Sequence, residues 1–141
     1  MRTEDDWTET ALLVADGGGD LEEAAYSDWE PVRFAAAGRA DLPDEQVRTL
    51  ASDPSPSVRA AVAARPDLDP DLLDQLVVDE EPCVLRALAA RPDLPGDARA
   101  RLSRSLDAGV LRALGETRAA DLLESMPAPP LRTARRRLFG R

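Results

Sequence analysis

A segment of 26 residues recurs along this chain, and no other feature constrains its fold as strongly. The tetrapeptide Arg-Pro-Asp-Leu occurs at residues 65–68 and again at 91–94, with no gap needed to align the residues around it. Weaker copies with the same spacing precede and follow these two units. A fixed period of this length is typical of proteins in which similar units stack on one another and share a core.

Each regular unit predicts two short helices. The first is expected to begin at a proline turn, with Ser55 capping the helix that starts at Pro56, and to end before the Arg-Pro pair. The expected second helices cover residues 44–51, 70–78 and 96–104. Because isolated helices of two or three turns are marginal in water, packing between units must stabilise them.

Apolar residues fall on one stripe of each predicted helix. In the central unit these are Val58, Ala61 and Val62 in the first helix, and Leu73, Leu76 and Val77 in the second. Their spacing of three and four residues places them on one face, which we expect to be buried against the neighbouring units.

The two ends of the array are less regular. We expect helices over residues 7–15 and 20–26 at the start, and over residues 110–114 and 117–125 at the end. Four of the five aromatic residues lie near the start, namely Trp7, Tyr26, Trp29 and Phe34, so this end is expected to be the better anchored cap. The sequence predicts an all-α solenoid of about five two-helix repeats with degenerate terminal units. Its expected parts are an N-terminal cap (1–27), regular repeats (28–104), a C-terminal cap (105–126), and a Pro-rich linker with a basic tail (127–141).

The repeat has a recognisable consensus. Residues 58–76 read Val-Arg-x-Ala-Val-Ala-x-Arg-Pro-x-Leu-x-x-x-Leu-Leu-x-x-Leu, which closely resembles the bacterial leucine-rich repeat variant family. The resemblance implies a right-handed superhelix in which an α-helix alternates with a 3₁₀-like helix, without strands, and a shape related to HEAT-type arrays. It carries over no catalytic residue, because the signature describes packing.

An ordinary leucine-rich horseshoe is the alternative fold, since its repeats have a similar length. It requires Leu-x-x-Leu-x-Leu in each unit, but the columns that read LDQLVV at residues 73–78 read VRTLAS at 47–52 and RARLSR at 99–104. Prolines such as Pro56 and Pro82 also interrupt the region where a strand would lie. The strand-bearing fold is therefore disfavoured.

Composition argues against several kinds of chemistry. The chain has no histidine and one cysteine, Cys83, which excludes a histidine relay, the usual zinc ligand sets and an iron–sulfur cluster within this chain. We therefore expect no catalytic, cofactor-binding or metal-binding residues, and no enzyme activity. The single cysteine and the absence of a long apolar run indicate a cytoplasmic protein.

An arginine recurs at the end of each first helix, at Arg39, Arg65 and Arg91, two residues before an aspartate. In one interpretation each arginine binds the carbonyl groups at the helix C-terminus and pairs with that aspartate. In the other, the three arginines line the solenoid groove and meet acidic side chains or phosphates of a partner.

The chain also has strongly asymmetric charge. The first 30 residues hold ten carboxylates, whereas the tail is basic and holds Arg132, Arg135, Arg136, Arg137 and Phe139 as candidate contacts. The leading hypothesis is a non-enzymatic scaffold that binds a segment of a partner protein in the groove. The alternative is association with nucleic acid through the arginine column and the tail.

Overall fold

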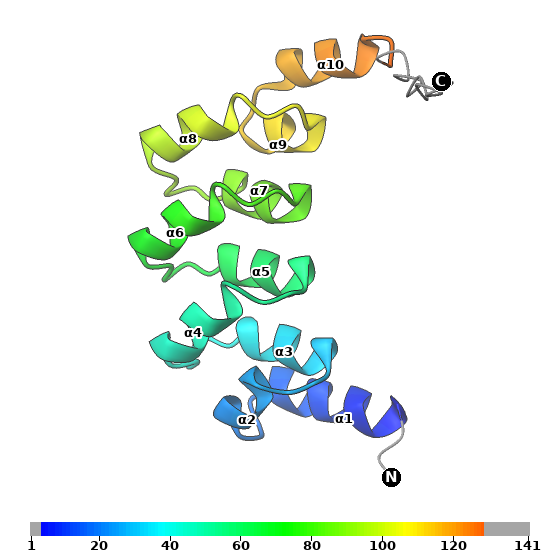
Figure 1. Ribbon diagram of the computed structural model, residues 1–141, viewed down its shortest axis with the longest axis vertical. Helices are drawn as coiled ribbons and strands as arrows, with labels where there is room; N and C mark the ends of the chain where they lie inside the picture. Colours follow the sequence, from blue (N-terminus) through cyan, green and yellow to red (C-terminus); the bar gives the residue numbers. More distant parts are fainter. Residues whose placement is uncertain (1–3, 129–141) are drawn as a thin grey trace, which may run out of the picture.

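The computed structural model of the protein describes residues 4–128, and the regular structure in this range consists entirely of helices (Figure 1). They are α1 (Glu4–Ala15), α2 (Leu21–Ala25), α3 (Glu30–Ala37), α4 (Asp44–Leu50), α5 (Pro56–Ala63), α6 (Pro70–Leu76), α7 (Pro82–Ala89), α8 (Gly96–Leu102), α9 (Ala108–Ala113) and α10 (Thr117–Ser125). No strand occurs in this range, so the predicted all-α fold is confirmed and the horseshoe is excluded for the described residues.

The helices stack in two columns along the long axis of the molecule (Figure 1). The first helices of successive units contact one another, α1 with α3, α3 with α5, α5 with α7, and α7 with α9. The shorter helices α2, α4, α6 and α8 form the second column beside them. The second helices are α-helical, which differs from the 3₁₀-like geometry that the resemblance implies.

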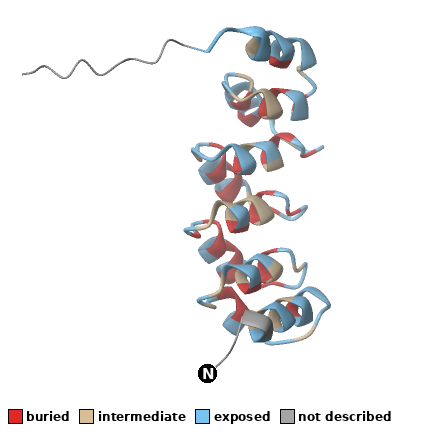
Figure 2. Ribbon diagram, turned by 90° about the vertical axis from the view of Figure 1, so that its right-hand side faces the viewer, coloured by how far each residue is buried: buried red, intermediate tan, exposed pale blue. Residues whose placement is uncertain are grey.

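Buried residues occur at successive levels along the array (Figure 2), and one core cluster extends from Val14 to Leu114. One valine from each first helix is at most 2% exposed, and one leucine from each regular second helix is similarly buried; these are Val32, Val58, Val84 and Val110, with Leu50, Leu76 and Leu102. The predicted stripe of the second helix, Leu73 with Leu76 and Val77, is buried in full. Each unit therefore completes the core of its neighbours.

The stripe predicted for the first helix packs on the core, but one of its positions is less deeply buried than the others. Val58 and Val62 are fully buried, but Ala61 is only half-buried, and Ala63 lies in the core. The helix α5 buries the residues at i, i+4 and i+5, because it packs on its own second helix as well as on the neighbouring first helices. Ala61 is thereby left at the edge of a surface hollow.

Several predicted boundaries also move. The first helix already includes Glu4, and the second helices end at Leu50, Leu76 and Leu102, one or two residues before the expected ends. The residues that follow adopt a last turn in which a backbone N–H donates three or four residues back. Each of these second helices is only seven residues long, and its buried apolar residues all belong to the core that the units share.

The proline turn before each first helix is organised by an aspartate. Ser55 occupies the N-cap position of α5 but its side chain makes no capping hydrogen bond, contrary to expectation. Instead, Asp53 Oδ1 accepts the Ser55 N–H at 2.8 Å, and Asp79 Oδ1 accepts the Glu81 N–H at 2.9 Å in the next unit. The aspartate that precedes the proline by three residues therefore shapes the entry to the helix.

The N-terminal unit is closed by two tryptophans. The rings of Trp7 and Trp29 stack with their centroids 5.1 Å apart, joining α1 to the residue that precedes α3. Tyr26 and Phe34 are about half exposed, so only part of the aromatic cluster serves as a cap. Among the described residues, no helix is long and apolar enough to cross a membrane.

Candidate partner-binding groove

The arginine at the end of each first helix points into the array. In the central unit Arg65 Nη1 donates to the carbonyl oxygens of Ala37 at 2.9 Å and Arg39 at 2.6 Å, both at the end of the preceding first helix. Its Nη2 donates to Asp67 Oδ2 at 3.0 Å, and the side chain is 4% exposed. Arg65 thus joins the end of one unit to the end of the previous one.

The same connection occurs in the neighbouring units. Arg91 Nη1 donates to the carbonyls of Ala63 and Arg65, and its Nη2 to Asp93. Arg39 Nη1 donates to the carbonyl of Val14 at 2.7 Å. Of the two interpretations, the one in which each arginine binds carbonyl groups at a helix C-terminus agrees with these hydrogen bonds. The carbonyl groups belong to the preceding unit, however, and not to the arginine's own helix. Direct contact of these arginines with a partner remains a prediction.

The aspartates paired with these arginines face the solvent. The side chains of Asp41, Asp67 and Asp93 are 62%, 56% and 60% exposed, and we refer to these three residues as the carboxylate ladder. The hydrogen bond from Arg39 holds the pKa of Asp41 below its usual value, and the bond from Arg65 does the same for Asp67. Asp41 and Asp67 therefore remain charged under mildly acidic conditions.

Two surface hollows lie beside the carboxylate ladder, and they are copies of each other. The first has a volume of about 360 Å³ and is lined by Gly38, Ala40, Ala61, Ala64, Arg65, Pro66 and Asp67. The second has a volume of about 290 Å³ and is lined by the residues 26 positions later: Ala64, Pro66, Ala87, Ala90, Arg91, Pro92 and Asp93. Ala64 and Pro66 line both, so the two hollows adjoin, and together we call them the repeat groove.

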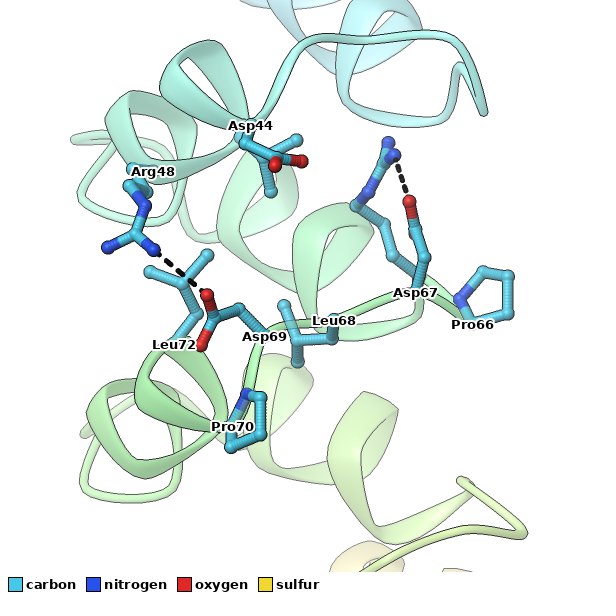
Figure 3. A pocket seen from close by; sticks show the side chains of 10 residues that line it. Asp44, Arg48, Pro66, Asp67, Leu68, Asp69, Pro70 and Leu72 are labelled. Atoms are coloured by element: carbon cyan, nitrogen blue, oxygen red, sulfur yellow. Dashed lines mark hydrogen bonds and ion pairs between the residues drawn. The ribbon is translucent and has the colours of Figure 1, made fainter.

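A third hollow, of about 420 Å³, opens on the α4 side of the loop between α5 and α6 (Figure 3). Figure 3 shows Arg48 of α4 joined to Asp69 of that loop, with a distance of 2.8 Å between Nη2 and Oδ2. Leu68 and Leu72 form part of its wall. Arg65, Pro66 and Asp67 line this hollow as well as the first hollow of the repeat groove, so the Asp67 carboxylate lies where the two meet.

A second set of arginines, which the sequence reasoning did not single out, also joins the units. Arg33 binds both carboxylate oxygens of Asp53, at 2.7 and 3.1 Å, and Arg59 binds Asp79 in the same way at 2.7 and 3.2 Å. Arg86 and Asp107 repeat the pair one unit later. The sequence contains a regularity that could have revealed these pairs, because each arginine precedes its aspartate by 20 or 21 residues.

These pairs affect the titration of their members. The hydrogen bond with Asp53 raises the pKa of Arg33, and that with Asp79 raises the pKa of Arg59. Burial raises the pKa of Asp79, but the bonds from Arg59 and from backbone N–H groups outweigh it and leave that pKa below its ordinary value. Arg33, Arg59 and Asp79 are therefore charged at neutral pH, as expected for members of structural ion pairs.

The remaining candidate residues do not form a reactive centre in the described part of the chain. Cys83 is exposed on α7, with its Sγ 3.8 Å from the Pro56 carbonyl oxygen. Within residues 4–128 no group of three or more histidine, cysteine, aspartate or glutamate side chains is arranged to hold a metal ion. The tail residues proposed as contacts, Arg132, Arg135, Arg136, Arg137 and Phe139, lie outside the described residues.

Comparison with known proteins supports the repeat assignment. Residues 56–81 match the family model described as leucine rich repeat variant, and this stretch contains α5, α6 and the loop that lines all three hollows. No curated protein and no solved structure matches the chain. The family match thus supports the resemblance over one unit, and the units on either side show a similar pattern of helix contacts.

Proposed function

We propose that this chain is a non-enzymatic scaffold that holds an extended, positively charged segment of a partner protein in the repeat groove. The observation that supports this most directly is the repetition of one hollow at a spacing of 26 residues, with an exposed carboxylate at each copy. Stacked repeats commonly use such extended surfaces for binding. We also propose that the scaffold acts in the cytoplasm. Residues 4–128 contain no helix that could span a membrane, which is compatible with this location.

The groove has the features of a site for an extended chain. Its floor is made of alanine and proline side chains, which let a backbone approach closely and offer apolar contacts. Its charged rim is acidic, since the arginines that accompany Asp67 and Asp93 are bonded inward. Electrostatic complementarity then selects a segment rich in arginine or lysine.

Association with nucleic acid is the alternative function. It would rely on Arg39, Arg65 and Arg91 and on the tail, but Arg65 and Arg91 have side chains no more than 5% exposed. Since six of the 18 arginines lie outside residues 4–128, this part holds 27 acidic and 12 basic residues, and its net charge opposes phosphate binding. The described residues therefore favour the protein scaffold.

Fluorescence anisotropy with labelled peptides tests the proposal. Extended peptides that carry several arginines and one or two large apolar residues should bind the full chain, whereas peptides of the same length with glutamate in place of arginine should not. Asp67→Asn/Asp93→Asn should weaken binding about fivefold, because two exposed ion pairs are lost. The matched control is Asp74→Asn/Glu80→Gln, which removes two exposed charges that line neither hollow of the groove.

Three outcomes would contradict the proposal. The first is equal binding of acidic and basic peptides, and the second is an equal loss of affinity in the groove variant and its control. The third is a mobility shift with duplex DNA at low salt that disappears when residues 131–141 are deleted, which would replace the scaffold with the nucleic-acid function.

A further inference from the structure

The basic end of the chain has the composition that we expect the repeat groove to bind, namely arginines next to large apolar residues. Residues 129–141 contain five arginines, three large apolar residues at Leu131, Leu138 and Phe139, and no acidic residue. We propose that residues 131–141 dock in the repeat groove of the same molecule and compete with the partner segment for it. This inference rests on the proposed function, because it uses the same groove as the binding surface.

Charge complementarity is the first argument. Residues 4–128 have a formal net charge of −15, since all 27 acidic residues and 12 of the 18 arginines lie there. Within the groove, Asp67 and Asp93 each present an exposed carboxylate whose own arginine is buried behind it. Arg135, Arg136 and Arg137 provide a compact cationic segment for these carboxylates.

The apolar contacts are the second argument. The two hollows measure about 360 and 290 Å³ and are floored by alanine and proline. A leucine or phenylalanine side chain that enters the hollow lined by Pro66 and Pro92 would lose apolar surface to water contact, which favours binding. Leu138 and Phe139 follow the arginine cluster directly, so both kinds of contact are available to one short segment.

The distance to the groove is the third argument. An extended chain spans about 3.3 Å per residue, so the nine residues from 129 to 137 reach about 30 Å. Packed helices are about 8–10 Å apart, and α9 is the next first helix after α7, which carries Ala87 and is followed directly by Ala90. Along the long axis of the array, about three such layers separate the hollow at Asp67 from α10 (Figure 1). Because the segment is tethered, its effective concentration at the groove is about millimolar.

Trypsin cleavage of the full chain tests this docking. Cleavage after Arg135, Arg136 and Arg137 is followed by mass spectrometry at low salt and at about 500 mM NaCl, where screening removes the attraction. A free synthetic peptide of residues 129–141 gives the rate for the undocked segment under each condition. Docking should slow cleavage of the full chain about fivefold at low salt, since only the released segment is cut, and the difference should vanish at high salt.

Variants locate the docking site. Asp67→Asn/Asp93→Asn should abolish the protection, whereas the charge-matched control Asp74→Asn/Glu80→Gln should retain it. Asparagine keeps an acceptor oxygen for Arg65 and Arg91, and a helical circular dichroism spectrum with a cooperative thermal transition shows that each variant is folded. Protection should also be independent of protein concentration over a tenfold range, as an intramolecular contact requires.

Each other result overturns the inference. Equal cleavage of the chain and the free peptide at low salt shows that the tail does not dock. Protection that survives in Asp67→Asn/Asp93→Asn places the tail elsewhere, and protection that is lost on dilution shows binding between molecules. None of these results affects the peptide-binding assay, so the groove can bind a partner without binding the tail. Conversely, tail protection without any peptide binding would separate the docking from the proposed function.

Discussion

At the scale of single residues, buried arginines decide how one unit is fastened to the next. Arg65 binds two carbonyl groups of the preceding unit and the carboxylate of Asp67, so its charge is compensated within the fold. Its Nε has no acceptor within the structure and is buried. A side chain with this environment tolerates few replacements, since any change leaves the carbonyls without their donor.

We expect Arg65→Ala to destabilise the protein by about 3 kcal/mol, because two buried carbonyls lose a charged donor. The control is Arg48→Ala, which removes an arginine whose side chain is 54% exposed and paired with Asp69; it should cost less than about 1 kcal/mol. Urea unfolding followed by circular dichroism measures both. Equal costs would show that Arg65 does not hold the units together.

The carboxylates of the ion pairs predict a loss of stability in acid. The pKa values of Asp67, Asp79 and Asp107 are lowered in the folded chain, so the unfolded chain takes up protons first as pH falls. Their stabilising effect is therefore full above the ordinary value of 3.8 and is lost as pH falls through the lower folded values.

Urea-unfolding free energies measured from about pH 6 to about pH 2.5 check this sign. The free energy should fall over the acidic part of this range. Asp79→Asn should be less stable at pH 6 and should show a shallower fall. A variant with the same slope as the unmodified chain would mean that Asp79 contributes nothing to the acid sensitivity.

At the scale of the helices, each element is too short to be stable alone. The regular first helices have eight residues and the second helices seven, well below the length at which isolated helices form in water. Their stability comes from leucine and valine side chains that are buried between units. Losing one such side chain should therefore affect more than its own helix.

Leu76→Asp should destabilise the array by at least about 3 kcal/mol, because it places a carboxylate at a site that is 1% exposed. Asp74→Ala changes an exposed position on the same helix and should alter stability by less than about 0.5 kcal/mol. Thermal unfolding of both variants distinguishes them. Equal unfolding temperatures would show that the two faces of α6 are assigned incorrectly.

At the scale of the whole molecule, the array is modular. The contacts between units repeat every 26 residues, including the Arg59 pair with Asp79 that repeats Arg33 with Asp53. Each unit contacts its nearest neighbours, so stability is close to a sum over units and their interfaces. A whole unit can therefore be deleted if the two units that are brought together present equivalent residues to each other.

Deletion of residues 54–79 should give a folded, helical protein. Asp53 then precedes Glu80 and keeps its pairing with Arg33, and Arg91 can reach the carbonyls of Ala37 and Arg39. The dependence of unfolding free energy on urea should fall by roughly a fifth, in proportion to the surface exposed on unfolding.

Deletion of residues 54–66 is the control, because it removes half a period and brings unlike positions together. We expect this variant to lose most of its helical circular dichroism signal, since no complete unit joins the two halves. If the two deletions behave alike, the units are not interchangeable.

The period and the apolar columns were sufficient, by themselves, to predict an all-helical array and its core, because burial of a repeated stripe depends only on the spacing of apolar residues. Leu76 and Val58 could be placed in this way. Spacing could not show which carbonyls Arg65 binds or that Arg59 meets Asp79, because those contacts connect residues about 20 to 28 positions apart. Only the stacking of units brings them together. The tertiary structure therefore decided that the arginine column faces inward and that the carboxylates beside it face solvent.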